Sequence, residues 1–309
     1  MPTVAPEIPV LTPNPRLPTW FGVGGGTSRF ASPTTIAQLA TLLAIDPNLK
    51  VLGDGANLLI DDAGIDNLVV RLSGTEFSQA TSDPKTGVLH AGAGVHLFAL
   101  INRTVKEGLA GLETLAGIPA TLGGAIVMNA GGAFGQIADV IERVHALDRR
   151  GNTVTLEKRD IAFDYRKSGL NHLIITGADL KLTPSDPVAL AKRKQEINDY
   201  KLRTQPMSAN SAGCCFKNPT LPHDVVHNGE PLGQKGKRVS AGMLIDRAGL
   251  KGLTHNTAKV SEQHANFLIT PDKNSGKARD IIELMGIVES RVRDAFGVTL
   301  EREVVVWQK

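Results

Sequence analysis

Glycine is concentrated in five short clusters between residues 22 and 132 of this 309-residue chain. The clusters are GVGGG at 22–26, GDG at 53–55, GAG at 92–94, GGA at 123–125 and AGG at 130–132. Glycine permits a positive φ angle and a close approach of a ligand to the main chain, and successive N–H groups in such turns bind phosphate oxygens. One cluster would indicate only a turn. Five clusters, two of them after an apolar strand, favour a ligand of the nucleotide type.

Two common nucleotide-binding folds are disfavoured. The fingerprint G-x-G-x-x-G would need a third glycine after Gly53 and Gly55, but Leu58 stands at that position. No G-x-x-x-x-G-K-[ST] stretch occurs either. A Rossmann domain and a P-loop domain are therefore not expected. Strands and helices alternate irregularly, which predicts the α+β class rather than a doubly wound parallel sheet.

Apolar spacing predicts the main elements. Helices are expected at 35–45, 95–107, 240–248 and 277–296, and strands at 58–60, 68–72, 144–147, 153–156, 173–182 and 298–307. A charged helix is expected near 185–202, because Ser185 or Asp186 can cap it, Pro187 suits its first position and Pro206 lies beyond its end.

Composition limits the partners. The net charge is +3 and aromatic residues make up 4% of the chain, so a nucleic-acid surface is not expected. Two cysteines cannot form a disulfide framework, which fits a reducing compartment. Because no signal peptide or membrane-spanning stretch is apparent, we expect a soluble cytoplasmic protein without a membrane partner. We also expect a monomer.

The two cysteines, Cys214 and Cys215, are adjacent in SAGCCFKNP. They could be a redox pair, half of a metal site, or one working thiol beside a buried one. Their spacing does not suit zinc and no histidine pair accompanies them, so no metal is expected. A disulfide between neighbours would close a strained ring. Along a strand the two side chains would point to opposite faces, and Cys215 is interpreted as a small buried hydrophobe.

Seven segments, in order, resemble motifs of the UDP-N-acetylenolpyruvoylglucosamine reductases, the MurB family. They are VLGDGANLLI, GLETLAGIPATLGGAIVMNAGG, FDYRKSGL, SAGCCFKNP, SAGMLIDRAGLKG, VSEQHANFLIT and GVTLEREVVVW. The resemblance extends over about residues 20–307. It implies an FAD-binding region of the PCMH type with two subdomains, followed by a smaller α+β substrate-binding domain.

The implied domains are an extended lead-in over 1–18, an FAD-binding domain over 19–184 with subdomains of about 19–75 and 76–184, a connector helix over 185–205 and a substrate domain over 206–309. The implied activity is reduction of UDP-N-acetylglucosamine enolpyruvate to UDP-N-acetylmuramate for peptidoglycan. NADPH would reduce the flavin, whose N5 would then deliver hydride to the enol ether.

The resemblance also implies site residues. Arg166 would hold the substrate carboxylate, Glu303 would stabilise the enol, and Cys214 occupies the position where the family most often has a proton-donating serine. A thiol releases a proton more readily than an alcohol, so it can act as this donor. The flavin would contact Gly53, Asp54, Gly55, Ala56, Asn57, Leu58, Gly117, Ile118, Pro119, Gly123, Gly124, Asn129, Ala130 and Gly131. The substrate would contact Tyr165, Lys217 and Asn218.

Some residues and functions stay open. His264 is interpreted as a core or supporting histidine rather than a base. The basic residues Lys235, Lys237, Arg238, Arg247 and Lys251 fit either a substrate diphosphate or an ordinary solvated surface. The alternative functions are a PCMH-type flavoprotein that acts on another nucleotide sugar or alcohol, and a nucleotide-sugar or flavin binder without turnover.

Overall fold

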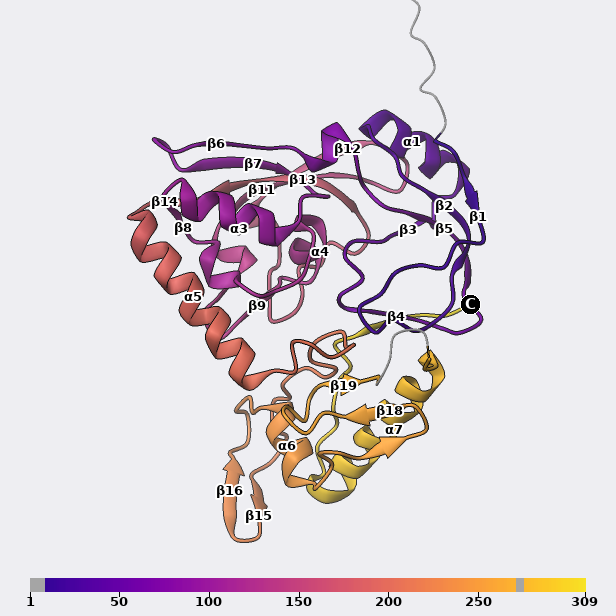
Figure 1. Cartoon of the computed structure of the whole chain (residues 1–309), viewed down its shortest axis with the longest axis vertical. Helices are drawn as coiled ribbons and strands as arrows, with labels where there is room; N and C mark the ends of the chain where they lie inside the picture. Colours follow the sequence, from indigo (N-terminus) through magenta and orange to yellow (C-terminus); the bar gives the residue numbers. More distant parts are fainter. Residues whose placement is uncertain (1–8, 271–274) are drawn as a thin grey trace, which may run out of the picture. The chain divides into compact units, whose positions relative to one another are not determined.

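The computed structural model describes residues 9–270 and 275–309 (Figure 1). Contacts group the chain into two compact units. The first unit contains the described residues up to Pro15, Thr27–Asp54 and Asp66–Tyr200, and the second contains Arg16–Gly26, Gly55–Ile65 and the described part of Lys201–Lys309. The linear domain prediction did not include this interleaving, and its boundaries stay a prediction. The expected lead-in begins outside the described residues.

The first unit is built around a five-stranded antiparallel sheet. Its strand order is β12 (Thr153–Glu157), β11 (Ile141–Leu147), β13 (Ile174–Lys181), β7 (Val88–Gly92) and β6 (Ala80–Asp83). The central strand β13 is buried from Ile174 to Leu180, as a strand covered on both faces must be. Helix α4 (Leu122–Val127) contacts β13 and β7, and α3 (Leu97–Lys106) contributes Leu97 and Leu100 to the same core. The strands predicted at 144–147, 153–156 and 173–182 are confirmed, and so is the α+β class.

A smaller sheet joins this unit. Its order is β1 (Thr12–Pro13), β2 (Thr27–Ala31), β5 (Ile65–Val70) and β3 (Lys50–Val51). The predicted helix α1 (Ile36–Ile45) is confirmed: the Thr35 hydroxyl accepts a hydrogen bond from the Gln38 N–H and caps it. Strand β5 begins before the predicted range of 68–72. Short elements complete the unit: α2 (Thr75–Ser78), the pair β8 (Leu109–Ala110) and β14 (Thr183–Pro184), and the pair β9 (Gly131–Gly132) and β10 (Gly135–Gln136).

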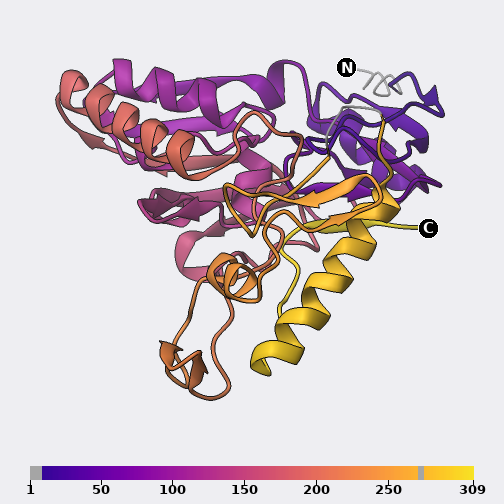
Figure 2. The same ribbon diagram turned by 60° about the horizontal axis from the view of Figure 1, so that its bottom comes forward.

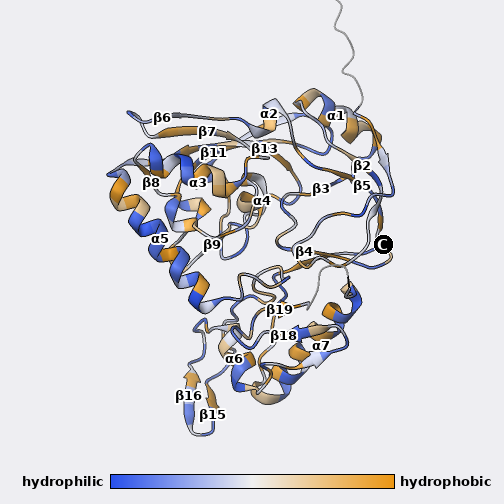
Figure 3. Cartoon of the chain, viewed as in Figure 1, coloured by the Kyte–Doolittle hydropathy of each residue, from blue (hydrophilic) through white to orange (hydrophobic). Residues whose placement is uncertain are grey.

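Helix α5 (Pro187–Thr204) confirms the predicted charged helix. The Asp186 carboxylate accepts hydrogen bonds from the N–H groups of Val188 and Ala189, both at 3.1 Å, and caps its start. Only Leu190 and Ile197 are buried, so most of the helix is hydrophilic (Figure 3). Neither α5 nor any other helix in the described ranges has an apolar stretch long enough to cross a bilayer.

The second unit packs helix α7 (Ala278–Phe296) against β17 (Thr254–His255) and β18 (Ala258–Val260), and β19 (Leu268–Ile269) extends that sheet. The buried face of α7 includes Ile281, Met285 and Val288, as the apolar spacing predicted. Gly297, with a φ of 65°, ends the helix in the left-handed conformation. Figure 2 shows α7 in yellow, with the short helix α6 (Ala241–Arg247) and the hairpin of β15 (Val225–His227) and β16 (Glu230–Gly233) in orange.

The predicted strand over 298–307 is wrong for most of its length. Only β20 (Val305–Trp307) is a strand, and it pairs in parallel with β4 (Leu58–Ile60). Upstream, the N–H of Lys217 donates to the carbonyl of Glu301, and Arg302 forms an antiparallel bridge with Phe216. Because the chain changes its partner after Glu303, residues 298–307 do not form one continuous strand.

Candidate active site

The loop before α4 carries part of the predicted flavin site in the first unit. Thr121 caps α4 through its hydroxyl, which accepts from the N–H of Gly124. Gly53 approaches this threonine so closely that a Cβ on Gly53 would lie 2.8 Å from the Thr121 Oγ1. Gly117, at the loop's other end, has a φ of 73°. The absence of a side chain at Gly53 therefore allows it to lie directly against the 117–124 loop of the first unit.

Two of the five glycine clusters have a different explanation. A Cβ on Gly92 would lie 2.4 Å from the carbonyl of Phe77, and one on Gly94 would lie 2.4 Å from the carbonyl of Leu72. In the second unit, a Cβ on Gly24 would lie 2.2 Å from the carbonyl of Ile60. Close packing of the chain against itself is sufficient to require these glycines, so they do not support a ligand.

Arg166 lies in a strained loop of the first unit. Its φ of 55° is in the left-handed region, which costs a residue with a side chain about 1–3 kcal/mol. Its Nη1 donates to the carbonyl of Gly131 at 2.6 Å, and its Cζ lies 5.5 Å from the centre of the Tyr165 ring. The side chain is half-buried. Arg166 is thus held directly against the AGG stretch that the sequence predicts as a flavin loop.

Two further bonds hold the Arg166 loop. The buried Asn129 donates from Nδ2 to the carbonyl of Asp164 at 2.9 Å, and its Oδ1 accepts from the N–H of Ala138 at 3.2 Å. The Ser168 hydroxyl, which is also buried, donates to the carbonyl of Val127 at 2.8 Å. Because the Asn129 amide is used inside the protein, its predicted contact with a flavin would have to come from the backbone.

Cys214 and Glu303 lie on neighbouring segments of the second unit. Cys214 forms an antiparallel bridge with Phe267, and the next residue, Cys215, accepts a hydrogen bond at its carbonyl from the N–H of Glu303 at 2.8 Å. The structure therefore places the backbone segments that carry Cys214 and Glu303 side by side, although these residues are 89 positions apart in the sequence. A proton donor and a group that stabilises an enol are the two side chains that the predicted chemistry needs.

The two cysteines differ sharply in environment. Cys215 is fully buried, and burial raises the pKa of its thiol to about 12. Cys214 is only partly buried. The interpretation of Cys215 as a buried hydrophobe agrees with this burial, and Cys214 is the more exposed thiol of the pair.

A buried asparagine fixes the cysteine segment. The side chain of Asn266 accepts from the N–H of Phe216 at 3.0 Å and donates to its carbonyl at 2.8 Å. Its own carbonyl accepts from the N–H of Cys215 at 2.8 Å. Asn266 lies in the segment VSEQHANFLIT, and its role could not be predicted from the sequence because no local pattern indicates a partner 50 residues away.

The predicted substrate residues Lys217 and Asn218 both have partners within the second unit. The Lys217 ammonium pairs with the Glu301 carboxylate at 2.5 Å. The Oδ1 of Asn218 accepts from the N–H of Ala241 at 2.9 Å, at the start of α6, where Ser240 also caps the helix. Asn218 therefore ties the cysteine segment to α6. Substrate contacts of these two residues stay a prediction.

A cavity of about 590 Å³ lies beside α6 within the second unit. It is lined by His227, Asn228, Ser240, Gly242, Met243, Asp246, Arg247, Lys251, Gln263, His264 and Ala265. Of the five basic residues considered from the sequence, only Arg247 and Lys251 line it. Their charges are partly balanced, because Lys251 pairs with Asp246 at 2.7 Å and Arg247 pairs with Glu230 at 3.0 Å.

His264 contributes a neutral ring to this cavity. Burial lowers the pKa of its imidazole, so the ring is uncharged at neutral pH. Its Nδ1 accepts from the N–H of Asn266 at 3.2 Å, which leaves the proton on Nε2. The ring therefore supports the backbone of Asn266, which agrees with its interpretation as a supporting histidine.

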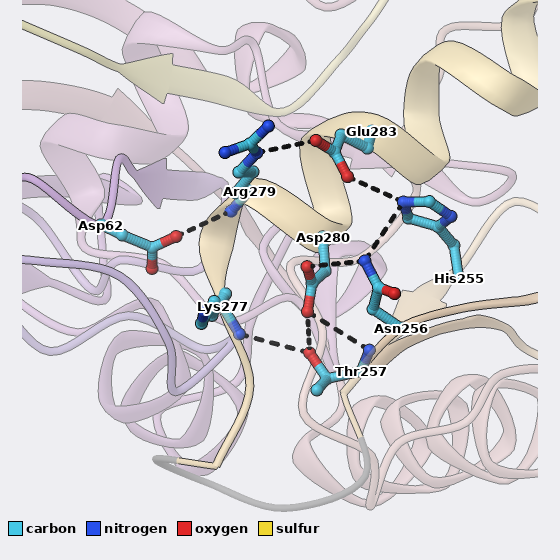
Figure 4. A network of polar contacts seen from close by, with 8 residues as sticks. All are labelled: Asp62, His255, Asn256, Thr257, Lys277, Arg279, Asp280 and Glu283. Atoms are coloured by element: carbon cyan, nitrogen blue, oxygen red, sulfur yellow. Dashed lines mark hydrogen bonds and ion pairs between the residues drawn. The ribbon is translucent and has the colours of Figure 1, made fainter.

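A polar network surrounds the start of α7 (Figure 4). The Asp62 carboxylate accepts from the N–H groups of Ala278 at 2.9 Å and Arg279 at 3.0 Å and caps the helix. Inside the network, the buried Asp280 accepts hydrogen bonds from Thr257 and Asn256. Burial raises the pKa of Asp280, but these hydrogen bonds outweigh it and hold the pKa below its usual value. Asp62 was not singled out from the sequence.

Comparison with known proteins identifies the class of the chain. A family model described as an FAD binding domain matches residues 27–157, so the chain is of the class that carries such a domain. A second model, described as the C-terminal domain of UDP-N-acetylenolpyruvoylglucosamine reductase, matches residues 205–307. Individual proteins with this name match more than nine tenths of the chain. The chain therefore belongs to the UDP-N-acetylenolpyruvoylglucosamine reductase family.

Three of these proteins show the extent of the similarity. The UDP-N-acetylenolpyruvoylglucosamine reductase of Desulfosudis oleivorans is 39% identical, with 93% of this chain and 91% of the relative covered. That of Syntrophobacter fumaroxidans is 38% identical, with 93% and 80% covered. The crystal structure of the reductase (MurB) from Thermus caldophilus has a TM-score of 0.76 and 36% identity, with 94% of this chain and 96% of that chain covered.

Proposed function

We propose that this protein is an FAD-dependent reductase that converts the enolpyruvyl group of UDP-N-acetylglucosamine enolpyruvate to the lactyl group of UDP-N-acetylmuramate, a step of peptidoglycan precursor synthesis. Membership of the reductase family over 93% of the chain carries this proposal. NADPH is the proposed reductant. The proposed compartment is the cytoplasm, because its reducing conditions agree with two free cysteines. The proposed oligomeric state is a monomer.

The residues present fit a flavin. The loop at Gly117–Pro119, the start of α4 at Gly123 and Gly124, and the stretch at Ala130 and Gly131 offer main chain without bulky side chains. Gly131 itself packs against the chain, since an added Cβ would lie 2.6 Å from the Gln136 Cβ, but one added at Gly132 would meet nothing within 4 Å, so there is open space beside the stretch. These backbone groups, with those of the GDG turn, would hold the cofactor. When bound, the flavin supplies a hydride that it has taken from NADPH.

The chain's own residues would then complete the reduction. Arg166 carries a planar guanidinium, which can hold the substrate carboxylate through two hydrogen bonds. Once hydride adds to one carbon of the double bond, charge develops on the other carbon and in the carboxylate. Glu303, in its protonated form, would donate a hydrogen bond to this enol, and Cys214 would give its thiol proton to the carbon. The hydride and this proton together saturate the double bond.

An anaerobic flavin titration tests the proposal. The purified protein should be yellow, should bleach with NADPH, and should regain its colour when UDP-N-acetylglucosamine enolpyruvate is added. UDP-N-acetylglucosamine, which lacks the double bond, is the control and should leave the flavin reduced. If the bleached protein recolours only with a different substrate, it is another flavoprotein oxidoreductase. If the protein cannot take up FAD, both enzyme functions are excluded.

A further inference from the structure

Asn57, which the sequence predicts as a flavin contact, is bonded directly to a candidate catalytic residue. Within the second unit, its Nδ2 donates to the main-chain carbonyl of Glu303 at 3.1 Å. Its own carbonyl accepts from the N–H of Val305 at 3.1 Å. One residue therefore holds the chain on both sides of Val304, immediately before the parallel pairing of β4 and β20 begins.

Glu303 is held from a second direction by the cysteine segment. Its N–H donates to the carbonyl of Cys215, as described above, so both main-chain polar groups of Glu303 are engaged by other segments. The direction in which a side chain leaves the backbone follows from the orientation of its two flanking peptides. Asn57 and Cys215 between them therefore set the direction in which the Glu303 side chain leaves the backbone.

The residue before Glu303 is anchored independently. Arg302 donates from Nε and Nη2 to the two carboxylate oxygens of Glu289 on α7, at 2.5 and 2.9 Å. The same α7 is capped by Asp62 (Figure 4), which lies five residues after Asn57. The segment 55–65 thus contacts Glu303 directly, through the Asn57 side chain. Through Asp62 it also caps α7, the helix whose Glu289 binds Arg302.

We propose that Asn57 is a positioning residue for Glu303, in addition to any backbone contact of its loop with the flavin. Its amide fixes the Glu303 peptide so that the carboxyl group meets the enol that forms on the substrate. This inference rests on the proposed function. Misplacing a catalytic group by about 1 Å can slow a reaction about 100-fold. Loss of the Asn57 donor should therefore slow the substrate step and spare the NADPH step.

The test uses Asn57→Asp, which keeps the size of the side chain but removes the donor, and Asn57→Ala. Stopped-flow absorbance would follow bleaching by NADPH and recolouring by the enolpyruvyl substrate separately. We expect the rate of bleaching and the affinity for FAD to change less than about threefold. Recolouring should slow about 10-fold to 100-fold, with a small change in the substrate concentration at half-maximal rate. Asn57→Gln, which retains a donor on a longer arm, should recover part of the rate.

Asn67→Ala is the matched control. Asn67 also donates from Nδ2 to a main-chain carbonyl at 3.1 Å, that of Asn48, and it belongs to the first unit. Its loss should leave both half-reactions unchanged. Thermal unfolding of all variants, followed by circular dichroism, ensures that folded proteins are compared.

A double-mutant cycle decides whether Asn57 acts through Glu303. In a Glu303→Gln background, Asn57→Ala should cause almost no additional slowing of recolouring, because the group that it positions is already lost. Full additivity of the two changes would overturn the inference. An equal loss of FAD affinity and of both half-reactions would also overturn it, by making Asn57 a flavin ligand alone. A wild-type protein that bleaches but never recolours would instead refute the proposed function, and the inference with it.

Discussion

In each of the two units, the side chain of a buried asparagine forms hydrogen bonds with the main chain of the segment that carries a candidate catalytic residue. We call each such set of hydrogen bonds a brace, and the two braces differ. Asn129 in the first unit has a left-handed backbone, with a φ of 43°, and bonds the Arg166 loop 35 residues downstream. In the second unit, the side chain of Asn266 forms hydrogen bonds with both main-chain polar groups of Phe216, which lies in SAGCCFKNP, 50 residues earlier in the sequence. The first brace shapes a strained loop, whereas the second aligns extended segments that also pair with one another.

This difference predicts how each candidate residue depends on its surroundings. Arg166 depends on a loop conformation that hydrogen bonds from Asn129 and Ser168 hold within the first unit. Cys214 and Glu303 depend on backbone pairing among segments from three parts of the sequence, near residues 57, 215 and 303. Changes to the first brace should therefore alter a loop, while changes to the second should disturb several segments together.

The largest expected effect on stability follows when either brace is removed. Asn129→Ala and Asn266→Ala each leave buried backbone groups without their partner, and each such group costs about 1–3 kcal/mol. We expect each variant to lose about 2–4 kcal/mol of unfolding free energy. The chain supplies separate probes, because both tryptophans, Trp20 and Trp307, belong to the second unit and both tyrosines belong to the first.

Urea unfolding followed by tryptophan fluorescence should therefore shift for Asn266→Ala, and tyrosine absorbance should shift for Asn129→Ala. The control is Asn152→Ala, which removes an exposed asparagine contact with Asp148 and should shift neither signal. If Asn266→Ala moved the tyrosine signal and left the tryptophan signal unchanged, the assignment of its brace to the second unit would be wrong.

A smaller effect is expected when Arg166 is replaced by lysine. Lysine keeps the charge but loses the planar pair of donors, and a hydrogen bond to a charged group contributes about 1.5–3 kcal/mol. Flavin recolouring by the enolpyruvyl substrate should slow about 10-fold to 100-fold, while bleaching by NADPH should keep its rate. Arg159→Lys is the control, since this arginine side chain is 84% exposed and should tolerate the change. Unchanged recolouring in Arg166→Lys would show that the carboxylate is held elsewhere.

The smallest expected effect concerns two buried aspartates at acid pH. Asp179, on β13 of the first unit, contacts His90, Arg143 and His145. Burial raises the pKa of Asp179, but the hydrogen bonds from the two histidines outweigh it and lower the pKa. Asp280 in the second unit also has a lowered pKa, but its partners are the neutral Thr257 and Asn256.

A carboxyl group with a lowered pKa in the folded state stabilises the protein above its ordinary pKa of about 4, and this stabilisation is lost as the pH falls through the lower, folded value. Both units should thus lose stability as the pH falls below about 4. Salt should weaken the stabilisation by Asp179 more than that by Asp280, because the Asp179 carboxylate pairs with the charged Arg143. The midpoints of thermal unfolding of Asp179→Asn and Asp280→Asn, measured from pH 6 to 3 at two salt concentrations, would test this. Equal salt dependence would contradict it.

The sequence predicted what local chemistry determines. The apolar spacing of α1 and α7, the cap offered by Asp186 and the charge of α5 are all short-range patterns, and the structure confirms the helices that they define. The glycine clusters were less informative. A glycine that packs against its own chain, such as Gly92 against Phe77, has the same sequence signature as one that faces a ligand.

The same difference between short-range patterns and contacts of distant residues applies to the candidate site. Its side chains could be named from motifs, but their supports could not, because these supports join distant positions. No pattern around Asn57 indicates that its amide meets the carbonyl of Glu303, and no pattern around Asp62 indicates that it caps α7. The strand predicted over 298–307 failed for this reason: its residues exchange one distant partner for another after Glu303.

The most direct test of the account is the rate at which reduced flavin is reoxidised by UDP-N-acetylglucosamine enolpyruvate in Cys214→Ala, Cys214→Ser and Cys215→Ala. Proton donation by a positioned side chain contributes about 100-fold to 10,000-fold. The account predicts a loss of that size for Cys214→Ala, substantial activity for Cys214→Ser, and a rate near the wild-type value for folded Cys215→Ala, whose thiol is buried. Bleaching by NADPH should be unchanged in all three. Reoxidation of Cys214→Ala at the wild-type rate would contradict the account.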